Sequence, residues 1–516
     1  MPKLNALGTR LASQLVAAKD AARQHDAAIA QEQKIHVVGA GATVTAAYEQ
    51  LRNAAEYTEE HLLLEKAILR FYRRLFLARD HQRVSSSADE LIVELTHAGY
   101  LKNDSIPQSC LITINQKAVR YFEAYLDYGP QKPRVEAWTT MVLASEVEAV
   151  LNSHAKHTVF VQFCHEYFKD TVNQEQLFGS PQKDFEVALY VAIHKALLRS
   201  DEATIRAMLL QRYHMTPENR DVYRSTNEQI DTLLASPAVE KLFRAITRQG
   251  APFRVLWRMI DGEQDVSMLL GERDRFLNAY QVKIAELYHG TRDRINRGIV
   301  KSIVFLIITK FLVGLAIEVP YDYVVHGSIV WLPLVINLLS PPVYMLLLRT
   351  TLMLPGEANT AAIMDIMDNV LFGEVSRSAS YRRANRSFGA AYNVAYAIFF
   401  LLIFGSVSWL LLSVGFTLLH LIIFFIFFST ASFLGFRLST IVRELEVVES
   451  AQNSVTVIRD FLYMPFVVVG RWISEKYSRF NFVAIVLDMI IELPLKTVLR
   501  LIRQWSAFIS SKKDEL

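Results

Sequence analysis

Residues 302–319, SIVFLIITKFLVGLAIEV, decide the fold, because this apolar run is long enough to cross a membrane as a helix. Three further runs of the same kind follow at 329–348, 394–412 and 416–436. Each has about the length that a helix needs to cross ~30 Å of hydrocarbon. The sequence therefore predicts an integral membrane protein with four transmembrane helices, arranged as two hairpins.

Basic residues lie on only one side of these runs. The connection near 320–328 contains no Lys or Arg, and the connection after the third run is only Ser413-Val414-Gly415. The basic residues flank the opposite ends: Arg292, Arg294, Arg297 and Lys301 before the first run, Arg349, Arg377, Arg382, Arg383 and Arg386 between the second and third, and Arg437 and Arg443 after the fourth. Because loops rich in Lys and Arg stay in the cytoplasm, we expect both termini and the Arg-rich loop there.

The first 300 residues have the pattern of long helices. Glycine and proline are scarce, with 20 and 15 in the whole chain, so turns are few. Apolar residues recur every three to four positions in 46–76, 184–198 and 202–213. Ser87-Ala88-Asp89-Glu90 has the pattern of a capping box, and Gly99 is an expected helix stop. No set of segments alternates as strands would, so we predict an all-α fold.

These patterns divide the chain into six expected segments. They are an amphipathic leader helix (1–35), a cytoplasmic all-helical domain (36–300), transmembrane hairpin 1 (301–349), an Arg-rich cytoplasmic loop (350–390), transmembrane hairpin 2 (391–437) and an interfacial amphipathic cytoplasmic tail (438–516). A loop rich in Gly and Pro at 129–134 is the expected place for a division of the cytoplasmic domain into two lobes.

The tail remains apolar after the fourth run. Pro465 interrupts an apolar run at 461–469, and a second run at 482–491 contains Asp488. Residues 495–509 have the basic amphipathic pattern of a helix in the membrane interface, although packing on the cytoplasmic domain is an equal alternative. For 461–491 the sequence leaves open an interfacial, a re-entrant or a packed segment.

Composition excludes some classes of function. The first 300 residues carry as many acidic as basic residues, so no nucleic-acid partner is expected. Cys110 and Cys164 are too few for a disulfide framework, and we expect both to be reduced. The final residues 513–516 read KDEL, but a cytoplasmic C-terminus would hide this retrieval signal from its lumenal receptor.

Lys310 is the sharpest candidate site residue, because it falls near the middle of the first run. A lysine at this depth costs about 2.5–3.5 kcal/mol on insertion scales, so we expect it to face the interior of the bundle. Asn337 has a similar depth in the second run, which also contains Pro333, Pro341 and Pro342. These prolines predict a helix break, so the set resembles the midplane sites of transporters. The favoured interpretation is a closed structural network that joins the hairpin.

Three further ionisable residues lie near the loop ends of the apolar runs. His420, early in the fourth run, is a candidate proton acceptor, with a single hydrogen-bonded interfacial histidine as the commoner alternative. Glu318 and Asp322 lie at the outer edge of the first run, where they could bind a cation or a polar head group. The favoured expectation for these two carboxylates is that they are solvated.

No motif predicts a catalytic site, a cofactor or a metal. His154, His157, Cys164 and His165 share a helical face, but 157 and 164 are ~10 Å apart along the axis, too far to ligate one ion together. Residues 37–44, VVGAGATV, imitate a dinucleotide fingerprint without its third glycine and without the following strand, so we interpret them as a hinge.

Four stretches resemble one protein family. They are YEQLRNAAEYTEEHLLLEKAI (48–68), ITKFLVGLAIEVPY (308–321), WLPLVINLLSPPVYML (331–346) and FLYMPFVVVGRWISEKYSRFNFVAIVLDMIIELPLKTV (461–498). The chain resembles an uncharacterised multi-spanning family from the genomes of ultrasmall, host-dependent bacteria. The resemblance implies a bacterial inner membrane and an all-helical cytoplasmic domain, and it transfers no site residue.

The favoured function is that of a membrane anchor or scaffold. Its cytoplasmic helical domain would bind protein partners, self-associate or organise the envelope, with lipid around the spans. The first alternative is a small oligomeric transporter or channel with Lys310 and Asn337 at its pathway. The second is a membrane-embedded enzyme acting on lipid, for which no nucleophile or metal cluster is evident.

Overall fold

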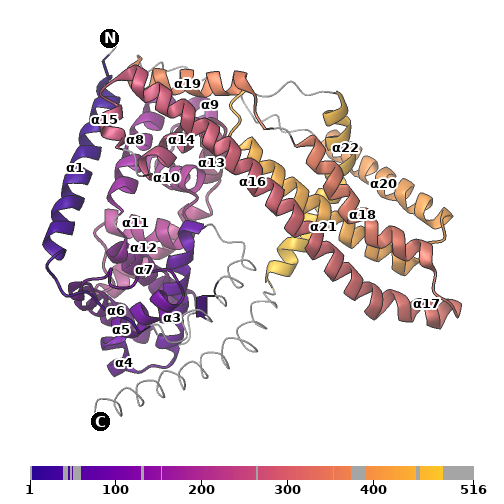
Figure 1. The fold of residues 1–516 in the computed structure, drawn as a ribbon, viewed down its shortest axis with the longest axis horizontal. Coiled ribbons are helices and arrows are strands. Elements are labelled where there is room, and N and C mark those ends of the chain that lie inside the picture. Colours follow the sequence, from indigo (N-terminus) through magenta and orange to yellow (C-terminus); the bar gives the residue numbers. More distant parts are fainter. Residues whose placement is uncertain are drawn as a thin grey trace. The chain divides into compact units, whose positions relative to one another are not determined.

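The computed structural model describes residues 3–38, 45–46, 49, 60–128, 133–152, 154–262, 265–352, 354–373, 390–448 and 454–479. Within them the chain is helical and contains no strand beyond a single bridge between Lys34 and Pro107, which confirms the predicted all-α fold (Figure 1). Two compact units are present. We call Asn5–Ile246 with Asp265–Ser267 the helical unit, and Thr247–Gln264 with Met268–Phe480 the membrane unit.

The helical unit is built around α7. Its helices are α1 (Ala6–Ile29), α3 (Leu63–Leu77), α4 (His81–Ser85), α5 (Ser87–His97), α6 (Gln108–Tyr128), α7 (Pro133–Leu151), α8 (Ala155–Thr171), α9 (Gln174–Phe178), α10 (Phe185–Ile193), α11 (Glu202–Arg212), α12 (Arg220–Leu234) and α13 (Pro237–Gln249), with short turns η1 (Glu60–Leu62) and η2 (His194–Leu198). Helices α3, α6 and α11 all pack on α7. Phe76, Phe122 and Tyr125 form a buried aromatic cluster. The ring centroid of Phe76 lies 5.0 Å from that of Phe122 and 5.2 Å from that of Tyr125.

Helix α1 packs on α8 through a leucine stripe. Leu7, Leu11 and Leu15 are buried, and their spacing places them on one face of the helix. Each fully buried leucine contributes about 1.5–3 kcal/mol from the hydrophobic effect. The apolar face of the predicted leader helix is therefore covered by protein.

The start of α5 differs from its predicted capping box. The helix begins at Ser87, so its N-cap is Ser86, and the Ser86 hydroxyl donates to the Gln82 carbonyl at 3.4 Å instead of capping α5. The free Ala88 N–H instead donates to Asn115 Oδ1 of α6 at 2.9 Å. Gly99 ends the helix with a φ of 83°, as predicted.

The membrane unit contains the four predicted spans. Its helices are α14 (Ala251–Ile260), α16 (Arg273–Val313), the π-helical turn η3 (Gly314–Glu318), α17 (Val319–His326), α18 (Trp331–Thr351), α19 (Glu357–Phe372), α20 (Ala390–Ser413), α21 (Leu418–Arg443) and α22 (Ser454–Arg479), while α15 (Val266–Leu269) lies at the division between the units. Among the described residues, four helical segments are long and apolar enough to cross a membrane: Arg273–His326, Trp331–Thr350, Val394–Ser413 and Leu418–Arg443.

The spans expose large apolar side chains and bury charged and polar ones. Phe311, Leu402 and Trp409 are 59%, 64% and 72% exposed, whereas Lys310 and Asn337 are at most 2% exposed. This distribution is the reverse of that in a water-soluble domain, and a hydrocarbon surrounding explains it. The chain is therefore a membrane protein.

Helix α16 continues through the predicted boundary at residue 300. It is a single helix of 41 residues, and no proline interrupts it. At Gly298, an added Cβ would lie 2.8 Å from Leu438 Cδ2, so the glycine allows α21 to pack closely. The first span is thus the direct continuation of a helix that begins well before the apolar run.

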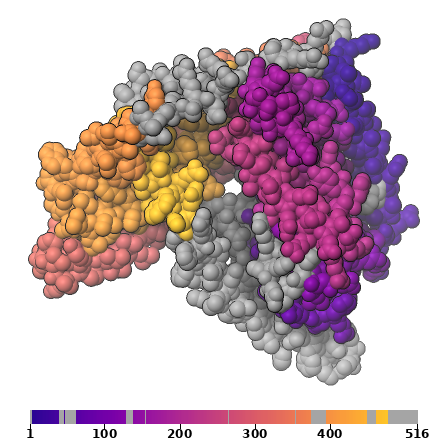
Figure 2. Space-filling view, turned by 180° about the vertical axis from the view of Figure 1, so that it is seen from behind, coloured from indigo at the N-terminus to yellow at the C-terminus, as the bar shows by residue number. Residues whose placement is uncertain are grey.

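Helix α22 packs along α21 (Figure 2). The helix runs continuously through Pro465. A Cβ on Gly470 would lie 2.0 Å from the carbonyl oxygen of Ser429, so only glycine permits this approach. Residues 461–479 therefore pack on the fourth span. The remaining predicted tail features, at 482–491, 495–509 and 513–516, lie outside the described residues.

Candidate functional site

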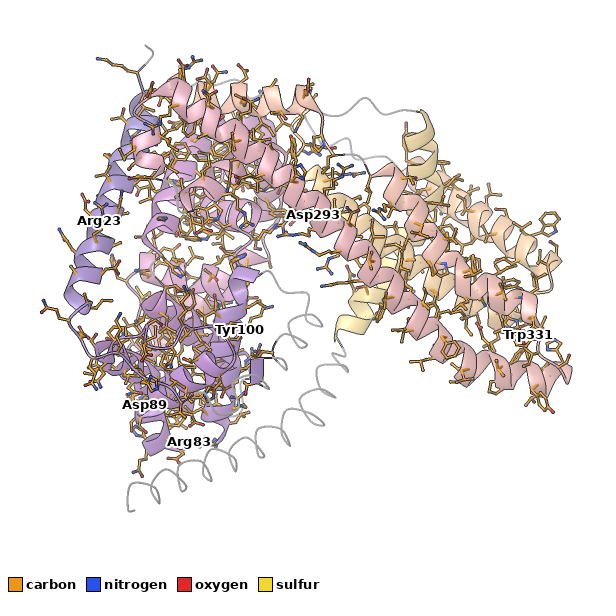
Figure 3. The ribbon with its side chains drawn as sticks, viewed as in Figure 1. Arg23, Arg83, Asp89, Tyr100, Asp293 and Trp331 are labelled. Atoms are coloured by element: carbon orange, nitrogen blue, oxygen red, sulfur yellow. The ribbon has the colours of Figure 1, made fainter. Side chains whose placement is uncertain are left out.

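Five polar side chains meet inside the membrane unit. Lys310, Glu318, Asp322, Asn337 and His420 are each at most 2% exposed, and we call them the intramembrane polar network. They come from α16, η3, α17, α18 and α21, near the end of the bundle where both hairpins turn. We call this the hairpin end; Trp331, at the start of α18, marks it in Figure 3.

Glu318 joins the two residues that the sequence singles out. Lys310 Nζ donates to Glu318 Oε1 at 2.5 Å, and Asn337 Nδ2 donates to the same oxygen at 3.0 Å. The Asn337 amide also donates to the backbone oxygen of His420 at 3.3 Å. The Lys310 ammonium lies 5.1 Å from the centre of the Phe427 ring, which adds a cation–π contact. Lys310 and Asn337 thus belong to one network, as predicted, but an acid connects them.

The π-helical turn explains why Glu318 meets Lys310. In a regular α-helix, residues eight apart are rotated by about 80° from one another, because each residue turns about 100°. The wider turn Gly314–Glu318 bonds i to i+5 and reduces the rotation per residue, which returns Glu318 to the face of Lys310. Its side chain also points back toward the helix start, as helical side chains do.

The expectation that Glu318 and Asp322 are solvated is wrong. Glu318 is 1% exposed and Asp322 is 0% exposed. The segment after Val319 is helix α17 rather than a loop, with Pro320 in its first turn, where a missing N–H is tolerated. The turn η3 thus places Glu318 against Asn337 of α18, and α17 places Asp322 near His420 of α21.

Asp322 lies between two histidines. Its Oδ1 is 3.4 Å from Nε2 of His420 and 3.9 Å from Nδ1 of His326, and its Oδ2 accepts from the Val330 N–H at 3.1 Å. His420 Nδ1 lies 3.0 Å from Thr417 Oγ1. His420 is 0% exposed, so it is an interior residue and not the interfacial histidine of the commoner alternative.

The prolines of the second span do not end its helix. Helix α18 continues from Trp331 to Thr351 with Pro341 and Pro342 inside it, and Pro333 lies in its first turn. Pro341 lacks the N–H that would bond to the Asn337 carbonyl. Packing of α18 on α16 and α21 supports the helix through this position.

The predicted topology residues that the structure describes are exposed. They are Arg292, Arg294, Arg297, Lys301, Arg349, Arg437 and Arg443. They lie on α16, α18 and α21 beyond the apolar runs, away from the hairpin end. Arg377, Arg382, Arg383 and Arg386 lie outside the described residues.

At the end of the membrane unit opposite the hairpin end, Asn359 forms hydrogen bonds that join three segments. No sequence motif marks this residue. Its Nδ2 donates to the Leu445 carbonyl at 2.7 Å and to the Tyr288 hydroxyl at 2.9 Å. Its Oδ1 accepts from the backbone N–H groups of Val447 and Val448 at 2.7 and 3.1 Å. The first part of the predicted Arg-rich loop is therefore a packed helix, α19, that ties α16 to the end of α21.

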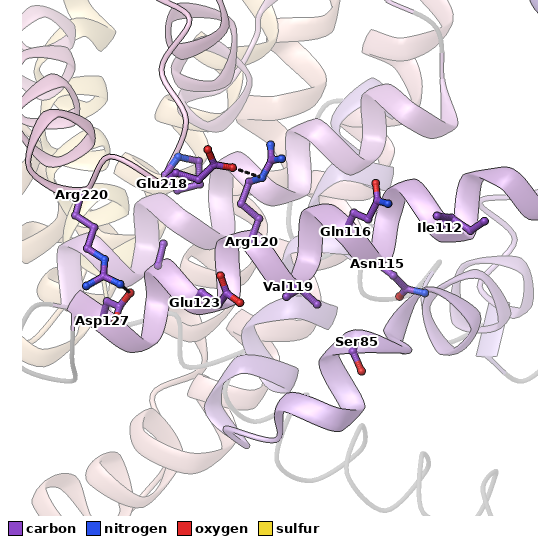
Figure 4. Close-up of a pocket in the computed structure, with 12 residues that line it drawn as sticks. Ser85, Ile112, Asn115, Gln116, Val119, Arg120, Glu123, Asp127, Glu218 and Arg220 are labelled. Carbon is purple, nitrogen blue, oxygen red and sulfur yellow. Dashed lines mark ion pairs between the residues drawn. The ribbon is translucent and has the colours of Figure 1, made fainter.

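A groove of about 700 Å³ lies on the surface of α6 in the helical unit (Figure 4). Ile112, which is 63% exposed, and Val119 supply apolar surface along α6. Two ion pairs cross from α6 to residues 217–220: Arg120 with Glu218 at 3.1 Å, and Asp127 with Arg220. The groove thus combines an apolar strip with two ion pairs, and Glu123 adds a further carboxylate to its lining.

The histidines considered as a metal set have different partners in the structure, although the rings of His154 and His157 lie 5.8 Å apart. His154 Nε2 contacts Glu148, the His157 ring lies 5.2 Å from that of His194, and His165 Nε2 lies 3.1 Å from the Glu186 carbonyl. Cys164 is fully buried. In the described part of the chain, no group of three or more His, Cys, Asp or Glu residues has the arrangement of a metal site. The residues of the fingerprint-like stretch at 39–44 are not described.

Burial dominates the electrostatics of the helical unit's interior. Desolvation, together with His154, lowers the pKa of His157 to about 3. Desolvation, together with the nearby Asp201, raises the pKa of Glu65 to about 8. Thr204 Oγ1 lies 2.8 Å from Glu65 Oε2 and partly offsets this rise. Glu65 is therefore largely protonated at neutral pH, and His157 is neutral.

No family model matches the chain, and no curated protein or solved structure is significantly similar to it. The resemblance to the family from ultrasmall bacteria therefore stays a prediction, and the candidate sites rest on the geometry alone.

Proposed function

We propose that the protein is a membrane anchor that presents its helical unit to protein partners. The observation that carries this proposal is the closure of the intramembrane polar network. Its five side chains are at most 2% exposed. In the described structure their polar contacts are with one another, with Thr417 and His326, and with backbone groups. A transport pathway at Lys310 and Asn337 would need a wet cavity beside them.

A closed network of this kind suits a structural role. Glu318 and Asn337 join the first span to the second, and Asn337 and Asp322 join these two to the fourth. Between membrane helices, hydrogen-bonded polar side chains hold neighbours together, typically by about 0.6 kcal/mol and at most 1–2 kcal/mol each. The network would therefore fix the packing of three spans at the hairpin end.

The proposed orientation places the helical unit in the cytoplasm of a bacterial cell and the hairpin end outside the inner membrane. The exposed arginines and lysine beyond the apolar runs support this orientation through the positive-inside rule. Lipid would cover the exposed apolar faces of the spans, exemplified by Phe311 and Trp409.

The groove on α6 is the proposed contact surface for a protein partner. It is concave, it exposes Ile112, and it is bordered by paired charges that can form a polar rim. An apolar centre with a polar rim is typical of protein interfaces. The partner in this proposal is a second protein chain, either another molecule or a second copy of this one.

Labelling of a cysteine at Asn337 tests the closed bundle. The background is Cys110→Ser with Cys164→Ala, and Asn337→Cys is compared with Ser328→Cys in the hairpin loop as the accessible control. We expect Ser328→Cys to react with a water-soluble maleimide and Asn337→Cys to be protected. Equal reaction rates at the two positions would reveal a wet cavity and would favour the transporter alternative.

Photocrosslinking from the groove tests the partner surface. A photoreactive residue at Ile112 should capture a defined adduct in cells that make the full-length chain, and Arg120→Glu should weaken it by breaking the pair with Glu218. Val16 on α1, which is 45% exposed, is the matched control position. The same adduct from both positions, or none from Ile112, would contradict a specific surface on α6.

A further inference from the structure

The intramembrane polar network is one positive charge short. It contains two carboxylates, Glu318 and Asp322, and one lysine, Lys310, which pairs with Glu318 at 2.5 Å. Asp322 is 0% exposed, and its only hydrogen bond in the described structure comes from the Val330 N–H at 3.1 Å. An isolated carboxylate in such a place is costly unless a countercharge or a proton accompanies it.

The groups facing Asp322 that can accept a proton are imidazoles. His420 from α21 lies 3.4 Å away, and His326 from the end of α17 lies 3.9 Å away, both measured to Asp322 Oδ1. The Tyr321 ring is 6.3 Å from each of the two imidazole rings. From α18 the network receives Asn337, which is uncharged and whose Oδ1 is buried without a hydrogen-bond partner. A neutral imidazole cannot balance the carboxylate, but an imidazolium can.

We propose that Asp322 and His420 form a proton-binding site that opens toward the hairpin end. One proton bound to His420 gives the ion pair Asp322–His420 and makes the five-residue network electrically neutral. Proton binding forms one N–H bond on the imidazole and breaks none in the protein. This inference goes beyond the proposed anchor function and does not depend on it.

Thr417 allows His420 to hold either protonation state. Its Oγ1 lies 3.0 Å from His420 Nδ1, and a hydroxyl is both a donor and an acceptor. Nε2 of His420 has no hydrogen-bond partner in the described structure, so the neutral ring can carry its proton there and accept the Thr417 O–H at Nδ1. The imidazolium donates its second N–H to the same oxygen after the hydroxyl has rotated. The site therefore gains a proton without losing a hydrogen bond.

His326 provides the entrance to this site. Its side chain is 36% exposed, at the helix end that Gly327 closes with a φ of 70°. The 3.9 Å between His326 Nδ1 and Asp322 Oδ1 is too long for a hydrogen bond, so transfer requires a small side-chain rotation or one bridging water. Beyond His420, contact continues through its backbone oxygen to Asn337, which carries no exchangeable charge, so the proton stops there.

Histidine NMR of the full-length chain in lipid nanodiscs tests the proposal. Imidazole nitrogens report directly on the number of ring protons, and His420→Gln and His326→Gln assign the two signals. We expect His420 to be an imidazolium at the acid end of a titration between about pH 5 and 8. In Asp322→Asn it should stay a neutral imidazole throughout. His289→Gln, at an exposed position on α16, is the matched control and should leave the His420 signal unchanged.

If His420 is a neutral imidazole at the acid end of the titration in the unmodified chain, the proposal is overturned. This outcome requires no substitution of Asp322. The proposal would equally fail if His420 became an imidazolium in Asp322→Asn to the same extent. The rate of proton exchange at His420 tests whether His326 is the entrance. His326→Gln should slow this exchange several-fold and leave the final protonation of His420 unchanged. An unchanged exchange rate would remove His326 from the path. Asn337 protection from maleimide is a separate outcome, so the anchor function and the proton site can fail independently.

Discussion

At the scale of single residues, charge and burial decide what each polar side chain does. Lys310 is recognisable in the sequence because a charge is rare in an apolar run. Its partner is Glu318, which the sequence places at the outer edge and the structure places 2.5 Å away. A carboxylate therefore has a structural role when it is buried beside a countercharge in the bundle and none when it is solvated at the outer edge. Only the neighbouring side chains distinguish the two cases.

Lys310 and Glu318 should be strongly coupled in stability. Lys310→Met and Glu318→Gln each leave a buried charge without its countercharge, and breaking a buried ion pair typically costs about 3–5 kcal/mol. The double variant removes both charges, so we expect it to be less destabilised than the sum of the single variants. Thermal unfolding of the full-length chain in detergent measures this cycle. Additive losses would show that the two side chains act separately.

Glu65 should make the helical unit less stable as the pH rises. Its pKa is raised from 4.5 to about 8 in the folded chain, mainly by burial, so folding favours the protonated form. This contribution is fully present below pH 4.5 and is lost as the pH rises through about 8. We expect the unfolding temperature to fall between pH 6 and 8, and Glu65→Gln to reduce that fall.

Glu240→Gln is the control for Glu65, because Glu240 lies on the surface of α13 in a pair with Arg244. Its substitution should leave the pH dependence unchanged. If Glu65→Gln and Glu240→Gln give the same slope as the unmodified chain, another group is responsible for the pH dependence.

At the scale of elements, close helix packing depends on single small residues. Gly470 on α22 meets the backbone of Ser429 on α21, where a Cβ would be 2.0 Å from the carbonyl oxygen. Gly298 faces the Leu438 side chain of α21, which is flexible and can move aside. Among the described helices, α21 therefore contacts α22 at a position that no larger residue could occupy without a shift of the helices.

Gly470→Ala should separate α22 from α21. The added methyl group clashes with backbone, which cannot move aside as a flexible side chain can. We expect faster proteolysis within α22 and a lower unfolding temperature. Gly405→Ala is the matched control, because a Cβ at this helical position of α20 meets nothing within 4 Å. There the exchange of glycine for alanine should be neutral or stabilising by up to ~1 kcal/mol. Equal effects of the two substitutions would contradict the close approach.

At the scale of the whole molecule, the two hairpin turns lie at the same end of the membrane unit. His420, just after the second turn, faces Asp322, just before the first, at 3.4 Å. Four spans with both turns on one side match the charge pattern of the sequence, in which the basic residues lie only beyond the other ends of the runs.

Cysteine labelling in intact cells should show this sidedness. In the background without Cys110 and Cys164, Ser328→Cys and Val414→Cys in the two turns should react with an impermeant reagent. Ala358→Cys, exposed on α19, should react only after permeabilisation. Labelling of Ser328 and Val414 from opposite sides would contradict the paired hairpins, and labelling of Ala358 alone from outside would invert the orientation.

The sequence by itself determined the helical class, the four spans and the candidates Lys310, Asn337 and His420. These properties depend on residue type and spacing along one segment, because hydrocarbon imposes length and apolarity on every span. Only the tertiary structure decided that Glu318 joins Lys310 to Asn337, that Asp322 faces His420, and that Asn115 caps α5. Such contacts join segments far apart in the chain, and a single π-helical turn rotates one side chain onto another face. Neither leaves a pattern in the local sequence, so the polar network of this bundle became visible only when the helices were packed.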